Sequence, residues 1–292
     1  MKSVRVVGII YNPRATKALS MAEEIFQTIG PGRQCWMGSA DDEITNPHLD
    51  ETDLIITVGG DGTILRAVRV AVAHDIPLLG VNLGRLGFMT ELRAEEALKR
   101  IPRYLEGGGW LEERSMLKVQ VLHGGGDPDP TDSPSFHALN DAVLGRGAGG
   151  RLIWVKAFVD GASLTSYRAD AVIVSSATGS TGYNLSAGGP ILDPHAQEMI
   201  LKPVAPHVGL ATAVVLRASA TVELTVESDD GAILSVDGYL DQRIQKGDGV
   251  RIQRSPKKAR FVREGGDKEF YASLTRRLGF EGGMGAGRAV FY

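Results

Sequence analysis

A glycine-rich loop between an apolar run and a helical pattern constrains the fold of this chain more than any other feature. Residues 53–58 are mostly apolar, and Gly59-Gly60-Asp61-Gly62-Thr63 follow them directly. Over residues 63–74 the apolar side chains recur at helical spacing, so we predict a strand, a tight loop and a helix. Such a unit is typical of parallel α/β sheets, in which ligands bind beyond the carboxyl ends of the strands.

The segments around this loop extend the same alternation. Residues 4–11 and 77–81 are predicted strands, while residues 17–29 and 94–106 are predicted helices. The N-terminal part is therefore predicted to be an α/β domain with a parallel, Rossmann-like sheet. Because three glycines follow the last of these helices, we place the first domain at residues 1–107.

The pattern changes after this boundary. Short β-rich segments separated by Gly, Asp, Pro and Ser predict an all-β, sandwich-like domain over residues 108–267, with a mobile hairpin loop at residues 124–134. Residues 268–277 are a predicted helix before a glycine-rich tail, and the segment 268–292 is a candidate to complete the first domain. The predicted strands of the second domain are residues 117–122, 138–144, 153–159, 171–175, 213–216, 222–226 and 250–253.

Composition narrows the class of protein. The 292 residues carry a formal charge of −3, so neither nucleic acid nor a membrane surface is a predicted partner. The single cysteine, Cys35, excludes an internal disulfide and fits a reducing compartment. No apolar run reaches the length of about 18 residues that a membrane-spanning helix needs. We therefore expect a cytoplasmic protein of two domains.

The chemistry of the loop at residues 59–63 has two interpretations. Glycines let the backbone approach a phosphate closely, and the free N–H groups at a helix start favour negative charge. An aspartate in such a loop suits a base that takes a proton from an attacking hydroxyl group, as in phosphoryl transfer. Alternatively, Asp61 only caps the helix and the glycines only permit the turn.

Other nucleotide-binding motifs do not fit this sequence. The chain has no G-x-x-x-x-G-K-[ST] loop and no G-x-G-x-x-G between a strand and a helix. Residues 145–150 read GRGAGG, but they lie between two predicted strands and are interpreted as a flexible hairpin loop. The six histidines show no metal-ligand spacing, so no metal-binding residues are predicted from the sequence.

Three further segments accompany the loop. Residues 80–88 read GVNLGRLGF, residues 139–141 read LND, and residues 178–190 read TGSTGYNLSAGGP. Together with GGDGT, these segments resemble the NAD kinase family over most of residues 4–275. The loop alone is shared with lipid kinases, whereas the string at 178–190 is specific to NAD kinases.

The resemblance implies transfer of a phosphoryl group from ATP or polyphosphate to the 2′-hydroxyl of the adenosine ribose of NAD, with a divalent metal, usually Mg²⁺. It implies that Asp61 is the general base and that Gly59, Gly60, Gly62 and Thr63 contact the phosphate donor. The implied NAD-binding residues are Asp61, Gly62, Phe88, Asn140, Asp141, Arg168, Asp170, Thr178, Thr181, Gly182, Tyr183 and Ser186.

Some of these residues also have plain structural interpretations. Phe88 either lies beside NAD or belongs to the core. Asn140 and Asp141 either hold the ribose or metal region or form a strand-end turn. Arg168 and Asp170 match a segment that, in oligomers of the family, reaches a neighbouring subunit's site, or they are an ordinary surface pair. The resemblance also implies a homodimer or homotetramer, with residues 108–267 as the NAD-binding and oligomerisation domain.

Two departures from the family pattern leave other functions open. Asp141 stands where the family usually has Glu, and Gly182 stands where it frequently has Ala. The shorter carboxylate motivates the alternative of a non-catalytic NAD(H) sensor, which would bind NAD without transferring phosphate. The shared loop motivates a lipid kinase of the diacylglycerol or sphingoid type, although the chain has no basic amphipathic helix or lipidation motif.

Overall fold

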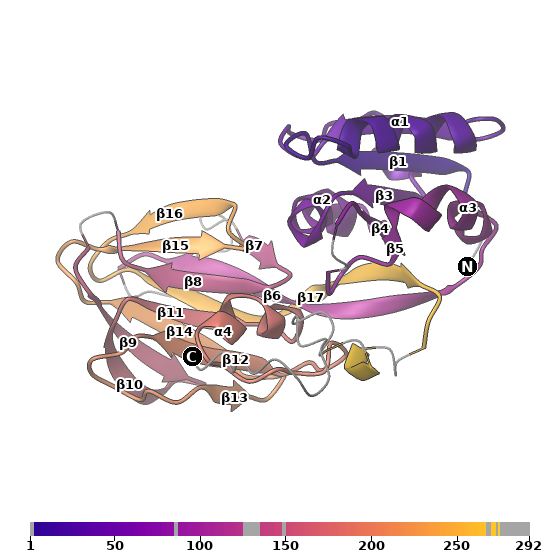
Figure 1. Cartoon of the computed structure of the whole chain (residues 1–292). Coiled ribbons are helices and arrows are strands. Elements are labelled where there is room, and N and C mark those ends of the chain that lie inside the picture. Colours follow the sequence, from indigo (N-terminus) through magenta and orange to yellow (C-terminus); the bar gives the residue numbers. More distant parts are fainter. Residues whose placement is uncertain are drawn as a thin grey trace. The chain divides into compact units, whose positions relative to one another are not determined.

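The structure is a computed structural model in which the chain divides into two compact units (Figure 1). Among the described residues, those up to Glu113 and those from Ala259 onward form the first unit, and Arg114–Lys258 form the second. The sequence-based division after residue 107 differs because two long strands, β6 (Trp110–Leu122) and β17 (Gly249–Arg263), each continue from one unit into the other. The structure describes residues 3–84, 87–124, 135–147, 150–266, 270–272 and 274.

The first unit is built on a parallel sheet. Its strand order is β2, β1, β3, β4, β5, with Ile9 opposite Ile56 and Ile56 opposite Leu79. The central strands are almost wholly buried on both faces, which is why they read as continuous apolar runs. The predicted parallel α/β domain is thereby confirmed. The strands are β1 (Val6–Tyr11), β2 (Gln34–Ser39), β3 (Leu54–Val58), β4 (Leu78–Asn82) and β5 (Leu92–Arg93).

Helices cover both faces of this sheet (Figure 1). Helices α1 (Ala18–Ile29) and α3 (Ala94–Leu105) share one core with the side chains of β1, β3 and β4 that point to their face. Helix α2 (Asp61–Ala73) packs on the opposite face, where a Cβ atom at Gly80 would come within 2.9 Å of Ile64. A short 3₁₀ turn, η1 (Leu49–Glu51), precedes β3.

Two antiparallel sheets form the second unit. One contains β10, β9, β14 and β17 in that order, and the other contains β13, β12, β11, β8, β15 and β16, while β6 pairs with β7. Val155 and Val222 of the first sheet belong to the same core as Val172 and Leu234 of the second, which confirms the sandwich-like, all-β domain. The remaining elements are β7 (Ser135–Ala138), β8 (Asp141–Gly145), β9 (Ile153–Val159), β10 (Ala162–Ala169), β11 (Ala171–Ser175), η2 (Thr178–Thr181), α4 (Tyr183–Ser186), β12 (Met199–Val204), β13 (Val214–Leu216), β14 (Thr221–Val226), β15 (Ala232–Val236) and β16 (Leu240–Ile244).

Some sequence-based element predictions were wrong. The strand predicted at 138–144 is two strands, β7 and β8, because the backbone turns at Leu139 and Asn140 to donate hydrogen bonds to Asp237. Helix α2 begins at Asp61 rather than at Thr63. The prediction at 124–134 lies almost wholly outside the described residues, and those at 268–277 and in the glycine-rich tail lie largely or wholly outside them.

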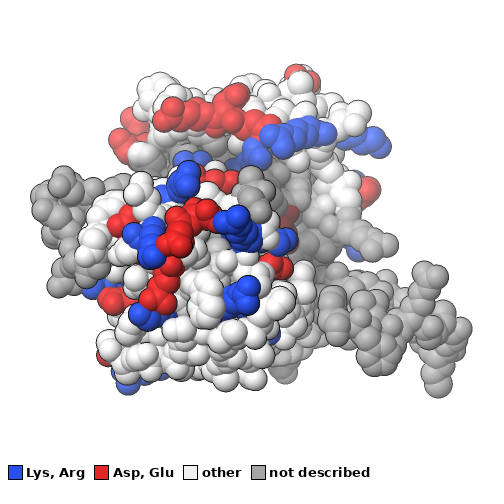
Figure 2. Space-filling view, turned by 90° about the vertical axis from the view of Figure 1, so that its left-hand side faces the viewer, with Lys and Arg blue, Asp and Glu red and all other residues white. Residues whose placement is uncertain are grey.

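Charged side chains of both signs share the surface. In Figure 2 basic and acidic groups are interspersed over much of the face in view. The second unit has ion pairs between Lys156 and Glu227 and between Arg151 and Asp230, which keep opposite charges adjacent. Among the helices of the described residues, none is both long and apolar enough to cross a lipid bilayer.

Candidate functional site

The glycine loop lies at the carboxyl end of β3 and leads into α2. Gly59 has a positive φ of 156°, and a Cβ atom there would lie 2.2 Å from the hydroxyl oxygen of Thr63. Only glycine therefore fits at this position without displacing Thr63. The Thr63 side chain is buried, and its Oγ1 atom has no hydrogen-bond partner within the described part of the chain. A buried hydroxyl of this kind is suited to bind a ligand oxygen.

A cavity of about 190 Å³ opens beside this loop in the first unit. Arg14 and Arg66 both pair with Asp41 at its wall, the Arg14 Nε to Asp41 Oδ2 distance being 2.8 Å. Two guanidinium groups beside a helix N-terminus form a favourable environment for phosphate oxygens. The cavity is lined by Asn12, Arg14, Ala40, Asp41, Gly60, Gly62, Thr63 and Arg66.

Sequence reasoning missed the arginines and Asp41. Arg14 follows β1, which pairs with β3, and Asp41 follows β2, which pairs with β1 on its other side in the parallel sheet. Since carboxyl ends of neighbouring parallel strands share one edge, residues after β1 and β2 approach the loop after β3. This signal requires the strand order, which the sequence pattern does not provide.

The carboxylate of Asp61 is held by the segment that contains the GVNLGRLGF motif. Asp61 Oδ2 accepts a hydrogen bond from the Phe88 N–H at 2.9 Å, and Oδ1 accepts one from Met89 at 3.2 Å. A Cβ atom at Gly87 would lie 2.2 Å from Asp61 Oδ1. Asp61 is partly exposed, and its carboxylate has lone pairs beyond these two bonds with which to accept a proton.

Phe88 is half-buried in the first unit. Its ring lies 6.3 Å, centroid to centroid, from the ring of Phe270, in a tilted arrangement. Aromatic pairs at this distance contribute to packing. Phe88 therefore has an aromatic neighbour in the structure. Arg85 and Leu86 of the same motif lie outside the described residues.

The Leu139–Asp141 segment forms a tight turn between β7 and β8. The Asp237 carboxylate accepts hydrogen bonds from the N–H groups of Leu139, Asn140 and Asp141 at 2.7, 2.7 and 3.0 Å. The Asn140 Oδ1 atom is buried and, among the described residues, has no hydrogen-bond partner. Asn140 thus combines a fixed backbone with a side-chain acceptor that a ligand can use.

The polar string at residues 178–190 divides into two groups. Ser180 and Asn184 are fully buried. The Ser180 hydroxyl donates to the carbonyl of Ala177, just before this segment, and Asn184 Nδ2 donates to the carbonyls of Ser180 and Pro190. These two residues therefore shape the turn. Thr178 is also buried, and its hydroxyl lies 3.4 Å from Arg114 Nη1.

The other predicted residues of this string lie nearer the surface. Thr181 donates a hydrogen bond to the Thr178 carbonyl at 3.2 Å, and Gly182 caps the helix α4. Tyr183 is 44% exposed, and Ser186 is also exposed. Their side chains are accessible to a ligand.

Arg168 and Asp170 have different partners. The Arg168 guanidinium lies over the ring of Trp154, 6.0 Å from its centroid, whereas Asp170 pairs with Arg146 at 3.1 Å. The interpretation of Arg168 and Asp170 as a pair with each other is therefore wrong. Arg168 is exposed, and its cation lies against the exposed ring of Trp154.

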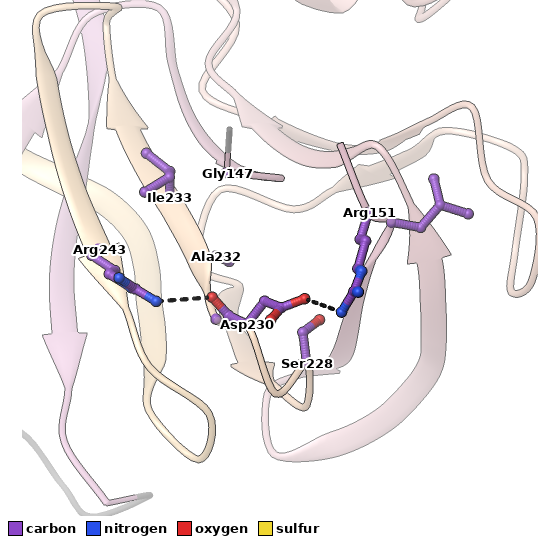
Figure 3. A pocket seen from close by; sticks show the side chains of 9 residues that line it. Gly147, Arg151, Ser228, Asp230, Ala232, Ile233 and Arg243 are labelled. Carbon is purple, nitrogen blue, oxygen red and sulfur yellow. Dashed lines mark hydrogen bonds and ion pairs between the residues drawn. The ribbon is translucent and has the colours of Figure 1, made fainter. Parts of the chain in front are cut away.

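A second cavity, of about 600 Å³, lies in the second unit (Figure 3). Arg151 pairs with the Asp230 carboxylate at 3.1 Å, and Arg243 donates to the Asp230 carbonyl at 3.4 Å. Both arginines thus point toward Asp230. Of the residues singled out in the sequence, only Gly147 of the segment 145–150 lines this cavity, and none of the expected NAD-binding residues does.

Two neighbouring carboxyl groups in the second unit have raised pKa values. Burial, together with the nearby charge of Asp237, raises the pKa of Asp141 to about 7. Burial raises the pKa of Asp237 to about 6, against the opposing effect of its three backbone hydrogen bonds. Asp141 therefore retains its proton in the folded protein at pH values at which an unfolded chain has lost it.

We expect this difference to lower stability as the pH rises. Between the unfolded pKa near 4 and the folded pKa near 7, the folded state binds more protons, so the free energy of unfolding falls with rising pH. Relative to wild type, Asp141→Asn should gain stability between pH 5 and pH 8, on the order of 3 kcal/mol. Urea unfolding at several pH values measures this difference.

Asp160→Asn is the matched control for this prediction. A backbone hydrogen bond from Thr221, followed by Arg217, lowers the pKa of Asp160, so its contribution is lost only in acid. The stability difference between Asp160→Asn and wild type should stay constant from pH 5 to pH 8. A constant difference for Asp141→Asn as well would contradict the raised pKa of Asp141.

The fold and the glycine-aspartate loop together define a phosphotransferase of the kinase class. The chain matches both domains of one such family: residues 36–109 match the ATP-NAD kinase N-terminal domain, and residues 139–264 match its C-terminal domain. The chain belongs to the NAD kinase family.

Named relatives agree with this assignment. The chain is 40% identical over 275 residues to an NAD kinase from Dehalococcoides mccartyi, covering 93% of this chain and 95% of the relative. It is 38% identical to an NAD kinase from Chloroflexus aurantiacus, covering 93% of this chain and 98% of the relative. Relatives of this similarity, matched along almost their whole length, support the assignment of both units to one enzyme.

Two solved structures share the fold. Yeast NADH kinase complexed with NADH superposes with a TM-score of 0.84 at 24% identity, covering 99% of this chain and 91% of that chain. An NAD kinase from Archaeoglobus fulgidus in complex with ATP superposes with a TM-score of 0.73 at 24% identity, covering 93% of this chain and 99% of that chain. These similarities establish the two-domain architecture.

Proposed function

We propose that this protein transfers the γ-phosphoryl group of ATP, or the terminal phosphoryl group of polyphosphate, to the 2′-hydroxyl of the adenosine ribose of NAD. The observation that carries the proposal is the 40% identity to an NAD kinase over nearly the whole chain. The loop geometry supports it, since an aspartate, a buried hydroxyl and two arginines surround one cavity or adjoin it.

Asp61 acts as the general base in this proposal. Its carboxylate takes the proton of the 2′-hydroxyl as the ribose oxygen forms a bond to the γ-phosphorus. The bond between the γ-phosphorus and the bridging oxygen breaks, and ADP leaves with the electron pair. The proton passes from Asp61 to solvent, so the products are NADP, ADP and a proton.

The first unit binds the phosphate donor. Backbone N–H groups of the loop, with Gly59, Gly60, Gly62 and Thr63, contact the phosphates, and the guanidinium groups of Arg14 and Arg66 offset their charge. A divalent cation, usually Mg²⁺ in this chemistry, supplies further charge neutralisation when bound. Within the described residues, no three His, Cys, Asp or Glu side chains are grouped so that they could hold a metal ion.

NAD binding in this proposal uses the residues that the resemblance to the NAD kinase family implies. Asn140 contributes its unpartnered Oδ1 atom to the ribose region, and the exposed Tyr183 supplies an aromatic ring. The remaining contacts are assigned to Asp61, Gly62, Phe88, Asp141, Arg168, Asp170, Thr178, Thr181, Gly182 and Ser186.

The direct test is an assay of the purified chain with NAD or NADH, ATP or polyphosphate, and Mg²⁺ or Mn²⁺. We expect NADP(H) to accumulate in proportion to the donor consumed, read by a coupled NADP-specific dehydrogenase. Tight NAD binding without NADP under every donor and metal would overturn the proposal in favour of a sensor. Donor consumption stimulated by lipid vesicles, and not by NAD, would favour a lipid kinase.

We also propose a cytoplasmic homodimer or homotetramer. The absence of cysteine pairs is compatible with a reducing compartment, and the all-β unit offers exposed apolar side chains such as Val208 and Val215 for assembly. Light scattering of the purified protein measures the mass, and a monomeric mass at working concentration would contradict the assembly.

A further inference from the structure

We infer that Asp237 is a positioning residue for NAD binding, acting through the Asn140 turn that it holds. This inference rests on the proposed function, in which Asn140 and Asp141 contact NAD. Asp237 was not among the residues that the sequence suggested, and it lies 97 residues after Asn140 in the chain. Its carboxylate nonetheless makes more hydrogen bonds to this turn than any other described side chain does.

The geometry is that of a carboxylate in a cradle of backbone N–H groups. Asp237 Oδ1 accepts from Asn140 at 2.7 Å and from Asp141 at 3.0 Å, while Oδ2 accepts from Leu139 at 2.7 Å. Successive N–H groups that converge on one anion make a strong, charge-assisted arrangement. The Asp237 N–H in turn donates to the Asp141 carbonyl at 3.0 Å, which extends the β8–β15 pairing.

The opposite side of the turn is held by the segment after β11. The Ser176 N–H donates to the Asn140 carbonyl at 2.8 Å, and the Ser176 hydroxyl donates to the Leu139 carbonyl. A Cβ atom at Gly179 would lie 2.1 Å from the Asn140 carbonyl oxygen, so the two segments are in close contact. All N–H and carbonyl groups of residues 139–141 thus have partners within the protein.

This complete pairing leaves the Asn140 side chain for the ligand. Its Oδ1 atom is buried and unpartnered among the described residues, while its backbone cannot shift without breaking hydrogen bonds on both sides. Groups that bind a substrate gain affinity when the surrounding protein fixes their geometry in advance. Asp237 supplies that fixation from one side and Ser176 from the other.

The backbone of Asp237 is also unusual. Its φ is +49°, a left-handed conformation that a residue other than glycine rarely adopts, and Gly238 follows with a φ of +70°. A hairpin turn accounts for this pair by itself, because Asp-Gly favours such turns. The chain offers a matched comparison in Asp160-Gly161, with φ values of +51° and +79°.

A variant of Asp160 can therefore show whether an effect of Asp237→Asn comes from the turn itself or from the position of Asn140. Its carboxylate accepts the Thr221 N–H at 2.9 Å and pairs with Arg217, so it also ties a hairpin in the second unit. It contacts none of the residues assigned to NAD. Asp160→Asn reproduces the chemical change of Asp237→Asn at another Asp-Gly turn, which lies away from the proposed NAD contacts.

The test is a double-mutant cycle read by NAD binding in calorimetry. We expect Asp237→Asn and Asn140→Ala each to weaken NAD binding about tenfold, and the double variant to lose no more than Asn140→Ala alone. Asp160→Asn should bind NAD as wild type does. In turnover, Asp237→Asn should raise KM for NAD about tenfold and leave KM for ATP within about twofold.

Several outcomes would overturn the inference. These are wild-type NAD affinity in Asp237→Asn, losses that multiply in the double variant, and equal changes in both KM values. Should Asp237→Asn fail to fold, Asp237→Glu keeps the charge while displacing the acceptors, and the same cycle applies to it. Because binding is measured without turnover, a wild-type protein that binds NAD but forms no NADP would overturn the proposed function alone.

Discussion

Asp61→Asn should abolish NADP formation while leaving NAD bound. The amide cannot take the proton of the 2′-hydroxyl, so we expect kcat to fall by about three orders of magnitude. The substitution keeps the size of the side chain, and the amide oxygen can still accept one of the hydrogen bonds from Phe88 and Met89. Steady-state assays with NADP detection measure the rate, and calorimetry measures NAD affinity.

Asp61→Asn also distinguishes two roles of Asp61, that of a general base and that of a residue that only caps helix α2. Asp61 is the first residue of α2, where a negative charge stabilises a helix by roughly 0.3–1 kcal/mol. A purely structural role therefore predicts a small loss of stability and a proportionate loss of activity. Turnover near the wild-type rate would rule out the base, whereas loss of both NAD binding and thermal stability would indicate that Asp61 mainly supports the fold.

Local sequence patterns correctly predicted the strand and the helix that flank the glycine loop. The apolar run before Gly59 is a strand buried on both faces, and periodic apolar residues after it form α2. These features depend on neighbours within a few residues, so periodicity detects them. Periodicity does not provide the order of the strands in the sheet, which depends on contacts between distant segments.

Long-range contacts at the candidate site could not be predicted in this way. Arg14, Asp41 and Arg66 meet only because β1, β2 and β3 are adjacent in the sheet. Asp237 reads as an ordinary Asp-Gly turn, and its three backbone partners lie far away in the sequence. The same contacts explain the error over residues 138–144, where alternating apolar residues hide a turn that a distant carboxylate stabilises.

The resemblance to the NAD kinase family located the GVNLGRLGF segment, but it did not show what this segment contacts in the fold. It placed Phe88 beside NAD, whereas the structure also gives the Phe88 N–H to Asp61. The neighbouring Gly87 leaves room for this contact, because any side chain there would occupy the position of the Asp61 carboxylate. The GVNLGRLGF segment thus orients the proposed base.

Gly87→Ala should consequently reduce catalysis without removing any polar group. The new Cβ atom would lie 2.2 to 2.6 Å from the Asp61 carboxylate atoms, so the carboxylate or the loop at 87–89 must move. A displacement of about 1 Å at a reacting group can lower the rate about 100-fold, and we expect a loss of that size in kcat. Affinity for NAD, measured by calorimetry, should change much less than kcat.

Gly84→Ala is the matched control in the same motif. A Cβ atom at Gly84 would have its nearest neighbour, Asn82 Oδ1, at 3.9 Å, an ordinary contact distance. Gly84→Ala makes the same change in the conformational entropy of the unfolded chain as Gly87→Ala, but it leaves Asp61 in place. Its kcat should therefore stay within about twofold of wild type. Equal losses of kcat in both variants would mean that any substitution in this motif lowers activity by destabilising the protein, and not by displacing Asp61. A wild-type kcat in Gly87→Ala would show that the position of Asp61 does not depend on Gly87.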